Sequence, residues 1–296
     1  MPKSPQIECV VDAKARLGEG TCWDSQAQCL WWVDIHSNLV HRYDPRTGQS
    51  HRFETPSLPG CVAVRRKGGL IVAMDRGFYF FDPDLGRVSP AVETDITSPN
   101  VRMNDGKTDR QGRFWAGSVF ESKTEPSQPL GALHRLDTDL SCHRVCDSIT
   151  CFNGLAWSPD SRVMYFTDSA TPYVWSCDFE PDSGEVRNRR VFIDLSSIGG
   201  VCDGATVDSE GYYWLTVPFK GLVLRFDPAG SLTSKIDIPT DVPTCCEFGG
   251  PNLDVLYVTT ATLGRTQEEL RGQQFAGGLF AIDVGVRGLP ASRFLD

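Results

Sequence analysis

Four oxygen-bearing side chains occupy the same position in successive copies of an internal repeat. Each lies five residues before a turn residue that opens into an aromatic-rich strand, and the four are Glu19, Asn104, Asn153 and Asp203. If the repeats form a ring, side chains at equivalent positions converge on its axis. Carboxylate and amide oxygens are the ligands that hard divalent cations prefer in proteins. The spacing therefore predicts a site for a divalent metal at the centre of the ring.

A simpler interpretation treats the same residues as turn formers. Asn104, Asn153 and Asp203 begin N-D-G, N-G and D-G sequences, which are common in turns. Glu19 fits no turn preference, however, and isolated turns do not require a register shared by four repeats. The convergent site is therefore the preferred interpretation, and small residues such as Gly20 and Gly204 would let the strands crowd the axis.

An aromatic-centred strand recurs six times along the chain. The copies span residues 30–35, 70–75, 113–118, 163–168, 212–217 and 255–260. A polar turn precedes each copy and another strand follows it, so each unit of about 40 to 50 residues has room for about four strands. Four strands make one blade of a β-propeller. The sequence thus predicts an all-β, six-bladed β-propeller formed by a single domain, residues 1–296, rather than a pair of β-sandwiches.

This arrangement carries further expectations. The strand before each polar turn should line the central channel. The alternating residues 7–12 should add the last strand to the sixth blade and close the ring, and residues 266–273 should form a short helix. The loops that surround the channel mouth are expected at residues 121–130, 170–173, 218–221 and 263–272. Because a closed ring buries its own sheet edges, we expect a monomer.

Composition excludes several classes of function. The formal net charge of −9 argues against a nucleic-acid partner, because a phosphate-binding surface needs clustered Lys and Arg. No run approaches the length of about 18 apolar residues that a membrane span needs, and the first residues lack the apolar stretch of a secretory signal. The eleven cysteines include no CxxC motif and are interpreted as reduced thiols. A cytoplasmic protein without a membrane partner is expected.

Longer motifs resemble those of a known family. The segments LGEGTCWD, RMNDGKTDRQGRFWAGS, FNGLAWSPDSRVMYFTDS and CDGATVDSEGYYWLTV are similar to those of the family of senescence-marker protein (regucalcin), gluconolactonase and luciferin-regenerating enzyme. The resemblance runs from about residue 7 to residue 290 and keeps the order of the family's motifs. It implies a six-bladed propeller with one divalent metal in the central channel. It also implies sugar lactonase activity, which many members have.

The resemblance also implies roles for individual residues. The family's metal ligands correspond to Glu19, Asn153 and Asp203, and its substrate contacts near the metal correspond to Arg102 and Asn104. Many members use a further glutamate after the third aromatic strand. Glu121 lies near that place, but residues 121–130 align with a small gap, which leaves Ser122 as the alternative counterpart.

The residues suggest hydrolysis of an aldonolactone to its aldonic acid. A divalent cation, for which Ca²⁺, Zn²⁺, Mn²⁺, Mg²⁺ and Fe²⁺ are candidates, would polarise the lactone carbonyl. Asp203 would bind the cation with one oxygen and deprotonate the attacking water with the other. Arg102, two residues before Asn104, would bind sugar hydroxyls or the new carboxylate, unless it forms only a salt bridge at the channel mouth.

Three competing functions remain open. A phosphoryl oxygen could replace the carbonyl oxygen on the metal, which would give a phosphotriesterase-like hydrolase. A propeller that binds calcium without turnover would be a regulatory protein, and a lactone that is not a sugar would be a different substrate. No GxSxG, HExxH or GxxxxGK[ST] motif offers another catalytic mechanism. Which sugar lactone is the substrate does not follow from the sequence.

Overall fold

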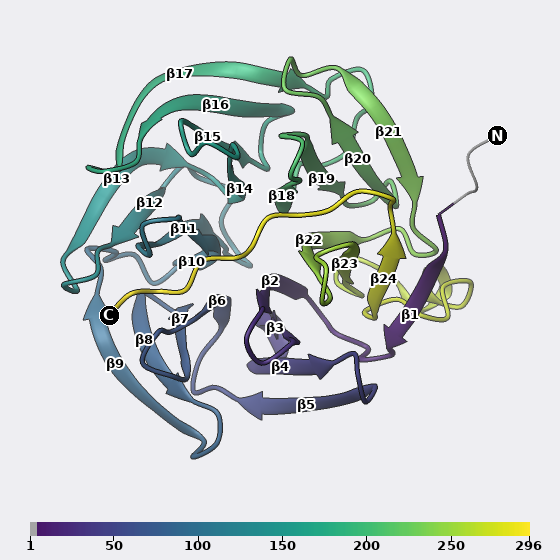
Figure 1. Cartoon of the computed structure of the whole chain (residues 1–296), viewed down its shortest axis with the longest axis horizontal. Helices are drawn as coiled ribbons and strands as arrows, with labels where there is room; N and C mark the ends of the chain where they lie inside the picture. Colours follow the sequence, from purple (N-terminus) through teal and green to yellow (C-terminus); the bar gives the residue numbers. More distant parts are fainter. Residues whose placement is uncertain (1–4) are drawn as a thin grey trace.

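The chain folds into six four-stranded antiparallel sheets arranged as blades around a central channel (Figure 1). The computed structural model describes residues 5–296, so the first four residues of the predicted single domain lie outside the description. The inner strands of neighbouring blades contact one another all the way round the ring. The predicted six-bladed β-propeller is confirmed.

The strands of each blade follow one another outwards from the channel. Blades 1 and 2 comprise β2 (Gly18–Asp24), β3 (Cys29–Asp34), β4 (Leu39–Asp44) and β5 (Gln49–Glu54), then β6 (Pro59–Val64), β7 (Leu70–Met74), β8 (Gly77–Asp82) and β9 (Arg87–Glu93). Blades 3 and 4 comprise β10 (Val101–Thr108), β11 (Phe114–Phe120), β12 (Gly131–Leu136) and β13 (Cys142–Ile149), then β14 (Phe152–Trp157), β15 (Val163–Asp168), β16 (Tyr173–Glu180) and β17 (Glu185–Asp194). Blades 5 and 6 comprise β18 (Ala205–Val207), β19 (Tyr213–Val217), β20 (Leu222–Phe226) and β21 (Leu232–Asp237), then β22 (Pro243–Gly249), β23 (Val255–Thr260), β24 (Leu279–Asp283) and β1 (Ile7–Val11).

The six aromatic-centred segments are the second strands of the blades, and they are buried because blades pack face to face. In β3, Trp31 packs into a cluster with residues of blade 2, whereas Trp32 packs into a cluster with Tyr257 and Leu279 of blade 6. Successive side chains of a strand point to opposite faces, so each of these two residues serves a different neighbour. The second strand of a blade therefore needs apolar side chains on both faces, so polar and apolar residues do not alternate along it.

Buried carboxylates fix the turns after the inner strands of blades 3 and 5. Asp109 accepts hydrogen bonds from the N–H groups of Gln111 and Arg113 and from the indole N–H of Trp115, at 3.0, 3.0 and 2.8 Å. Asp208 makes the same set of contacts in blade 5, where Trp214 Nε1 lies 2.9 Å from Oδ2. In these two blades, the aspartate ties the inner strand to the aromatic strand beside it.

The ring closes where the sequence predicted. Strand β1 pairs antiparallel with β24, and Ile7 lies opposite Ile282. The predicted helix is shorter than expected: α1 spans Gln267–Leu270, because Thr266 already serves as its N-cap in a capping box with Glu269 and the helix ends at Arg271. No helix of residues 5–296 is long and apolar enough to span a membrane.

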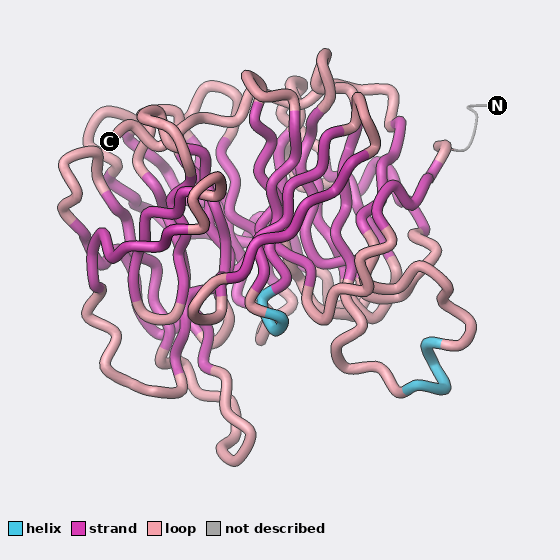
Figure 2. The backbone as a smooth tube through the Cα atoms, turned by 90° about the horizontal axis from the view of Figure 1, so that it is seen from below, coloured by secondary structure: helices cyan, strands magenta, loops and turns pink. Residues whose placement is uncertain are grey.

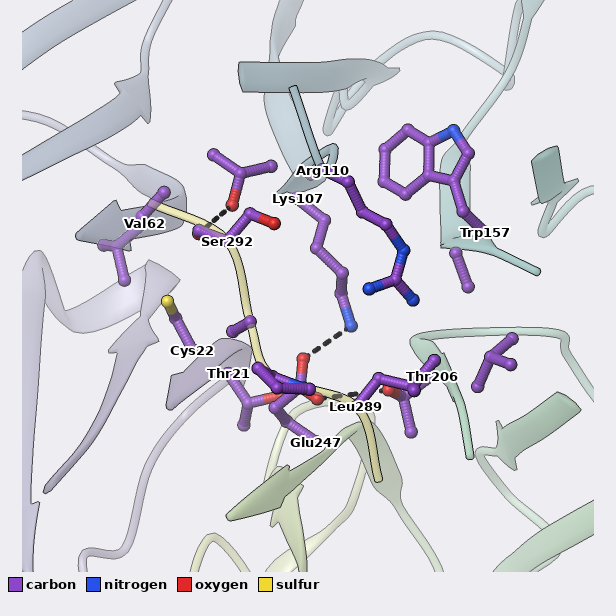
Figure 3. A pocket seen from close by; sticks show the side chains of 17 residues that line it. Thr21, Cys22, Val62, Lys107, Arg110, Trp157, Thr206, Glu247, Leu289 and Ser292 are labelled. Carbon is purple, nitrogen blue, oxygen red and sulfur yellow. Dashed lines mark hydrogen bonds and ion pairs between the residues drawn. The ribbon is translucent and has the colours of Figure 1, made fainter. Parts of the chain in front are cut away.

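One end of the channel is covered by residues 284–296, which cross the ring from blade 6 toward blades 2 and 3 (Figure 1). The N–H of Phe294 donates to Val64 O at 2.9 Å, that of Leu295 donates to Gly112 O at 3.0 Å, and Arg293 binds Asp24 at 2.6 Å. Beneath this segment lies a cavity of about 70 Å³ in which Lys107 binds Glu247 at 2.8 Å (Figure 3). No pattern in the sequence predicted this closing segment.

Phe294 provides a test of how much the crossing segment stabilises the ring. Its side chain is fully buried in a cluster with Cys61 and Phe114. Phe294→Ala should therefore lower the free energy of unfolding by about 3–5 kcal/mol, measured by urea unfolding. Leu85→Ala, at a position that is 71% exposed, is the control and should change it by less than about 0.5 kcal/mol. A loss below about 1 kcal/mol in Phe294→Ala would show that the segment is dispensable for stability.

Candidate functional site

The predicted ligand side chains meet in one cavity at the other end of the channel. Glu19 comes from β2, Asn153 from β14 and Asp203 from the residue pair before β18, so blades 1, 4 and 5 each supply one. The cavity measures about 290 Å³ and is also lined by Arg102 and Asn104 of β10. All five side chains are buried. The convergence expected from the repeat register is therefore present in the fold.

The two carboxyl groups of the site are desolvated together. Burial raises the pKa of Glu19, and the nearby charge of Asp105 adds to the effect. Burial likewise raises the pKa of Asp203, followed by the charges of Glu19 and Asp105. Within residues 5–296, no Lys or Arg forms a salt bridge with Glu19 or Asp203. A buried carboxylate pair without a cationic partner is unfavourable unless something else neutralises it.

The amide of Asn153 is held by a residue that the sequence analysis missed. Its Nδ2 donates to Ser169 Oγ at 2.8 Å, and the Ser169 hydroxyl donates to the carbonyl of Cys202 at 2.6 Å. Its Oδ1 accepts a hydrogen bond from Asn104 Nδ2 at 2.9 Å. This network points the amide oxygen toward the other site residues. Ser169 lies outside the register of the repeated site residues, so no pattern in the sequence identified it.

A chain of polar contacts forms the rim of the cavity. Arg102 donates from Nη1 to Asn104 Oδ1 at 2.8 Å and from Nε to Glu121 Oε2 at 2.6 Å. Glu121 Oε1 in turn lies 3.2 Å from Nε2 of His36. The salt bridge at the channel mouth, which was the alternative interpretation of Arg102, thus exists alongside its contact with Asn104 of the site. His36 lies in η1 (Ile35–Ser37) and is not among the site residues predicted from the sequence.

The structure distinguishes the two candidates in the loop after β11. Glu121 reaches Arg102, whereas the Ser122 hydroxyl accepts N–H bonds from Thr124 and Glu125 of the same exposed loop, at 3.3 and 3.1 Å. Ser122 is therefore occupied with its own loop, and Glu121 is the residue near the site. Figure 2 shows η1 and α1 on the side of the ring away from the C-terminus, so the site lies on the face opposite the crossing segment.

Most of the remaining cavity wall is apolar. Its apolar residues come from blades 5, 6 and 1, namely Leu17, Val201, Pro218, Phe219, Val242, Ala261 and Leu263. Thr244 of blade 6 also lines the cavity, and its hydroxyl donates to the carbonyl of Gly18. In the ring order, blade 6 stands opposite blade 3, which carries Arg102 and Asn104. The cavity therefore has a polar side and an apolar side. The predicted mouth loops 218–221 and 263–272 contribute to the apolar side.

The donor set suits a hard divalent cation. Two buried carboxylates and one amide oxygen are all-oxygen ligands, and a cation between them would offset their charge. Among the described residues no three His, Cys, Asp or Glu side chains gather at metal-binding distances, so a cation here would need Asn153 as its third protein ligand. Three protein ligands leave positions for water and substrate. The arrangement can thus bind a cation and a small polar molecule side by side.

Comparisons with known proteins agree over nearly the whole chain. The model of the SMP-30/Gluconolactonase/LRE-like region matches residues 17–262. Regucalcin from Danio rerio is 35% identical over 289 residues, which cover 97% of each chain. A pentonolactonase from Haloferax volcanii is 35% identical over 297 residues, which cover 96% of each chain.

A solved structure agrees as well. The luciferin-regenerating enzyme superposes with a TM-score of 0.91 at 27% identity, covering 98% of this chain and 99% of that one. The match of the family model over well more than half of the residues, together with relatives of this identity and coverage, shows the family. The chain therefore belongs to the SMP-30/gluconolactonase/LRE-like family.

Proposed function

We propose that this protein is a metal-dependent lactonase that hydrolyses a sugar lactone to its aldonic acid. The observation that carries the proposal is the burial of Glu19 and Asp203 together, with no salt bridge to either from residues 5–296, in a cavity that also presents Arg102. A relative that is 35% identical over 96% of the chain is named a pentonolactonase, which supports the same class of substrate.

Glu19, Asn153 and Asp203 are the residues that would hold the cation. Ca²⁺, Zn²⁺, Mn²⁺, Mg²⁺ and Fe²⁺ all accept such oxygen ligands. When bound, the cation supplies Lewis acidity that draws electrons from the lactone carbonyl and stabilises the oxyanion formed there. Asn153 is suited to its role because Ser169 fixes the orientation of its amide.

Asp203 and Arg102 supply the remaining chemistry. A carboxylate oxygen of Asp203 accepts a proton from water as the water oxygen bonds to the carbonyl carbon. The bond between that carbon and the ring oxygen then breaks, and Asp203 returns the proton to the departing oxygen, which becomes a hydroxyl group. Arg102 donates N–H bonds to substrate hydroxyls or to the new carboxylate. Glu121 and Asn104 hold its guanidinium in place.

Other features are consistent with a small-molecule enzyme of the cytoplasm. All eleven cysteines are free, as expected in a reducing compartment. The proposed form is a monomer, because the outer strands of the blades leave only short, protected sheet edges. A regulatory calcium-binding protein would need neither the cavity beside the carboxylates nor an arginine directed into it.

The direct test is hydrolysis of a panel of aldonolactones, followed by pH-stat. Metal-stripped protein should be inactive, and adding back one of the five cations should restore acceleration over spontaneous ring opening. Asp203→Asn should lower kcat by about 10²–10⁴-fold, because it removes the proton acceptor. Asp84→Asn, at an exposed turn, is the matched control and should be unaffected. Acceleration of a phosphotriester but of no lactone, or of neither, would overturn the proposal.

Cation binding can be tested without activity. Because the cation binds only the folded protein, a concentration of about 100 times Kd should stabilise it by about 2.7 kcal/mol, seen as a higher melting temperature. Glu19→Gln removes one of the two charged ligands and should abolish most of this gain, whereas Glu268→Gln on the exposed face of α1 should keep it. An undiminished gain in Glu19→Gln would place the cation elsewhere.

Arg102→Lys tests substrate binding. Lysine presents a point charge and cannot contact Glu121 and Asn104 while also donating to the substrate. We expect KM to rise by about tenfold or more, with a smaller change in kcat, in steady-state kinetics. Arg110→Lys, at the covered end of the channel, should leave both constants unchanged. An unchanged KM in Arg102→Lys would remove Arg102 from the substrate site.

A further inference from the structure

The apolar side of the cavity restricts which lactone can bind. A sugar that carries a hydroxyl on every carbon would turn some of them toward Leu17, Val201, Pro218, Phe219 and Leu263, which offer no side-chain hydrogen-bonding group. A hydroxyl buried without a partner is unfavourable. Every charged side chain that lines the cavity lies elsewhere, on Glu19, Arg102 and Asp203. The apolar side therefore suits a neutral, nonpolar part of the substrate.

Phe219 is held in this wall at a conformational cost. Its φ is 64°, and it is the one aromatic residue among residues 5–296 with a positive φ. Left-handed backbone is unfavourable for a bulky residue and persists where the surroundings impose it. The side chain is 46% exposed, so burial in the core does not explain the conformation. Phe219 is the third residue of the turn Val217–Lys220, in which the N–H of Lys220 donates to Val217 O at 3.3 Å, and this turn places its ring at the cavity mouth.

Neighbouring residues position the ring of Phe219. The guanidinium of Arg265 lies 4.9 Å from the ring centroid, and Arg265 is itself bound to Asp241 at 2.8 Å and to Glu269 at 3.1 Å. Glu269 is fixed in turn by the capping box of α1. At Gly264, a Cβ would lie 3.2 Å from Cε1 of the ring, so the absence of a side chain lets this loop pack against Phe219. Several contacts therefore fix the ring of Phe219 in the cavity wall.

We propose that this wall selects 6-deoxyaldonolactones, in which a methyl group replaces the terminal hydroxymethyl group. The inference rests on the proposed lactonase function and names its substrate class. With the carbonyl at Glu19 and Asp203, and the ring hydroxyls toward Arg102 and Asn104 of blade 3, the far end of the molecule faces blades 5 and 6. The methyl group then contacts Phe219 and Leu263, where a hydroxymethyl group would lose its hydrogen bonds.

Matched substrate pairs test the proposal, because each pair differs by one hydroxyl group. L-fucono-1,4-lactone is compared with L-galactono-1,4-lactone, D-fucono-1,4-lactone with D-galactono-1,4-lactone, and L-rhamnono-1,4-lactone with L-mannono-1,4-lactone. For at least one pair, kcat/KM should be about 10- to 100-fold higher for the 6-deoxy compound, the range that an apolar pocket achieves. Measurements use the cation-loaded full chain.

Two variants connect the preference to the wall. Phe219→Asn supplies a hydrogen-bonding amide and a residue that tolerates a positive φ, so the backbone is retained. It should reduce the preference to about threefold or less, and Leu263→Ser should reduce it in the same direction. The matched control is Leu232→Asn, which replaces an exposed leucine on the outer strand of blade 5 and should keep the wild-type ratio.

The outcomes separate this inference from the proposed function. If the wild type hydrolyses the hydroxymethyl lactones as fast as their 6-deoxy partners, the inference is wrong and the lactonase function stands. A preference that persists in both Phe219→Asn and Leu263→Ser would likewise overturn the assignment to this wall. If no lactone is hydrolysed with any of the five cations, the proposed function itself fails.

Discussion

The close approach of six strands to one axis determines the properties of the site. At Gly20, where φ is 58°, a Cβ would lie 2.8 Å from Cys61 Cα, and at Gly204 a Cβ would lie 2.7 Å from Cys245 Cα. Glycine is needed where backbones approach this closely. Glu19 and Asp203 directly precede these glycines, so their carboxyl groups are enclosed where the strands converge. Their high pKa values and their suitability for a cation both follow from that enclosure.

The residues that could be recognised from the sequence are those that the fold repeats. Asp109 and Asp208 each bind the turn and the tryptophan of the next strand, which fixes the distance along the chain from the channel to the turn. Because this device recurs, the offset of five residues identified Asn104 and Asp203 before their positions were known. The regular recurrence of the aromatic strands indicated the blades, and the alternation of residues 7–12 indicated the closing strand β1.

Features that occur once could not be predicted. Ser169 contacts Asn153, His36 contacts Glu121, and the ring of Phe219 packs against Arg265 in a loop of the next blade. Each of these contacts joins two segments whose spacing in the sequence is not repeated elsewhere in the chain. The crossing segment 284–296 is also single, and its contacts with blades 1, 2 and 3 are set by the finished ring. The shortened α1 reflects local capping rather than periodicity.

The pairing of β1 with β24 has a consequence for biosynthesis. More than two hundred and fifty residues separate Val11 from Leu279, so the sixth blade cannot form until the ribosome has released β24. Until then, the face of blade 1 that carries Trp23 and Trp32 lacks Tyr257 and Leu279, against which it packs. The blades that form first therefore expose an aromatic surface to solvent. Such a surface can bind chaperones and can associate with other nascent chains.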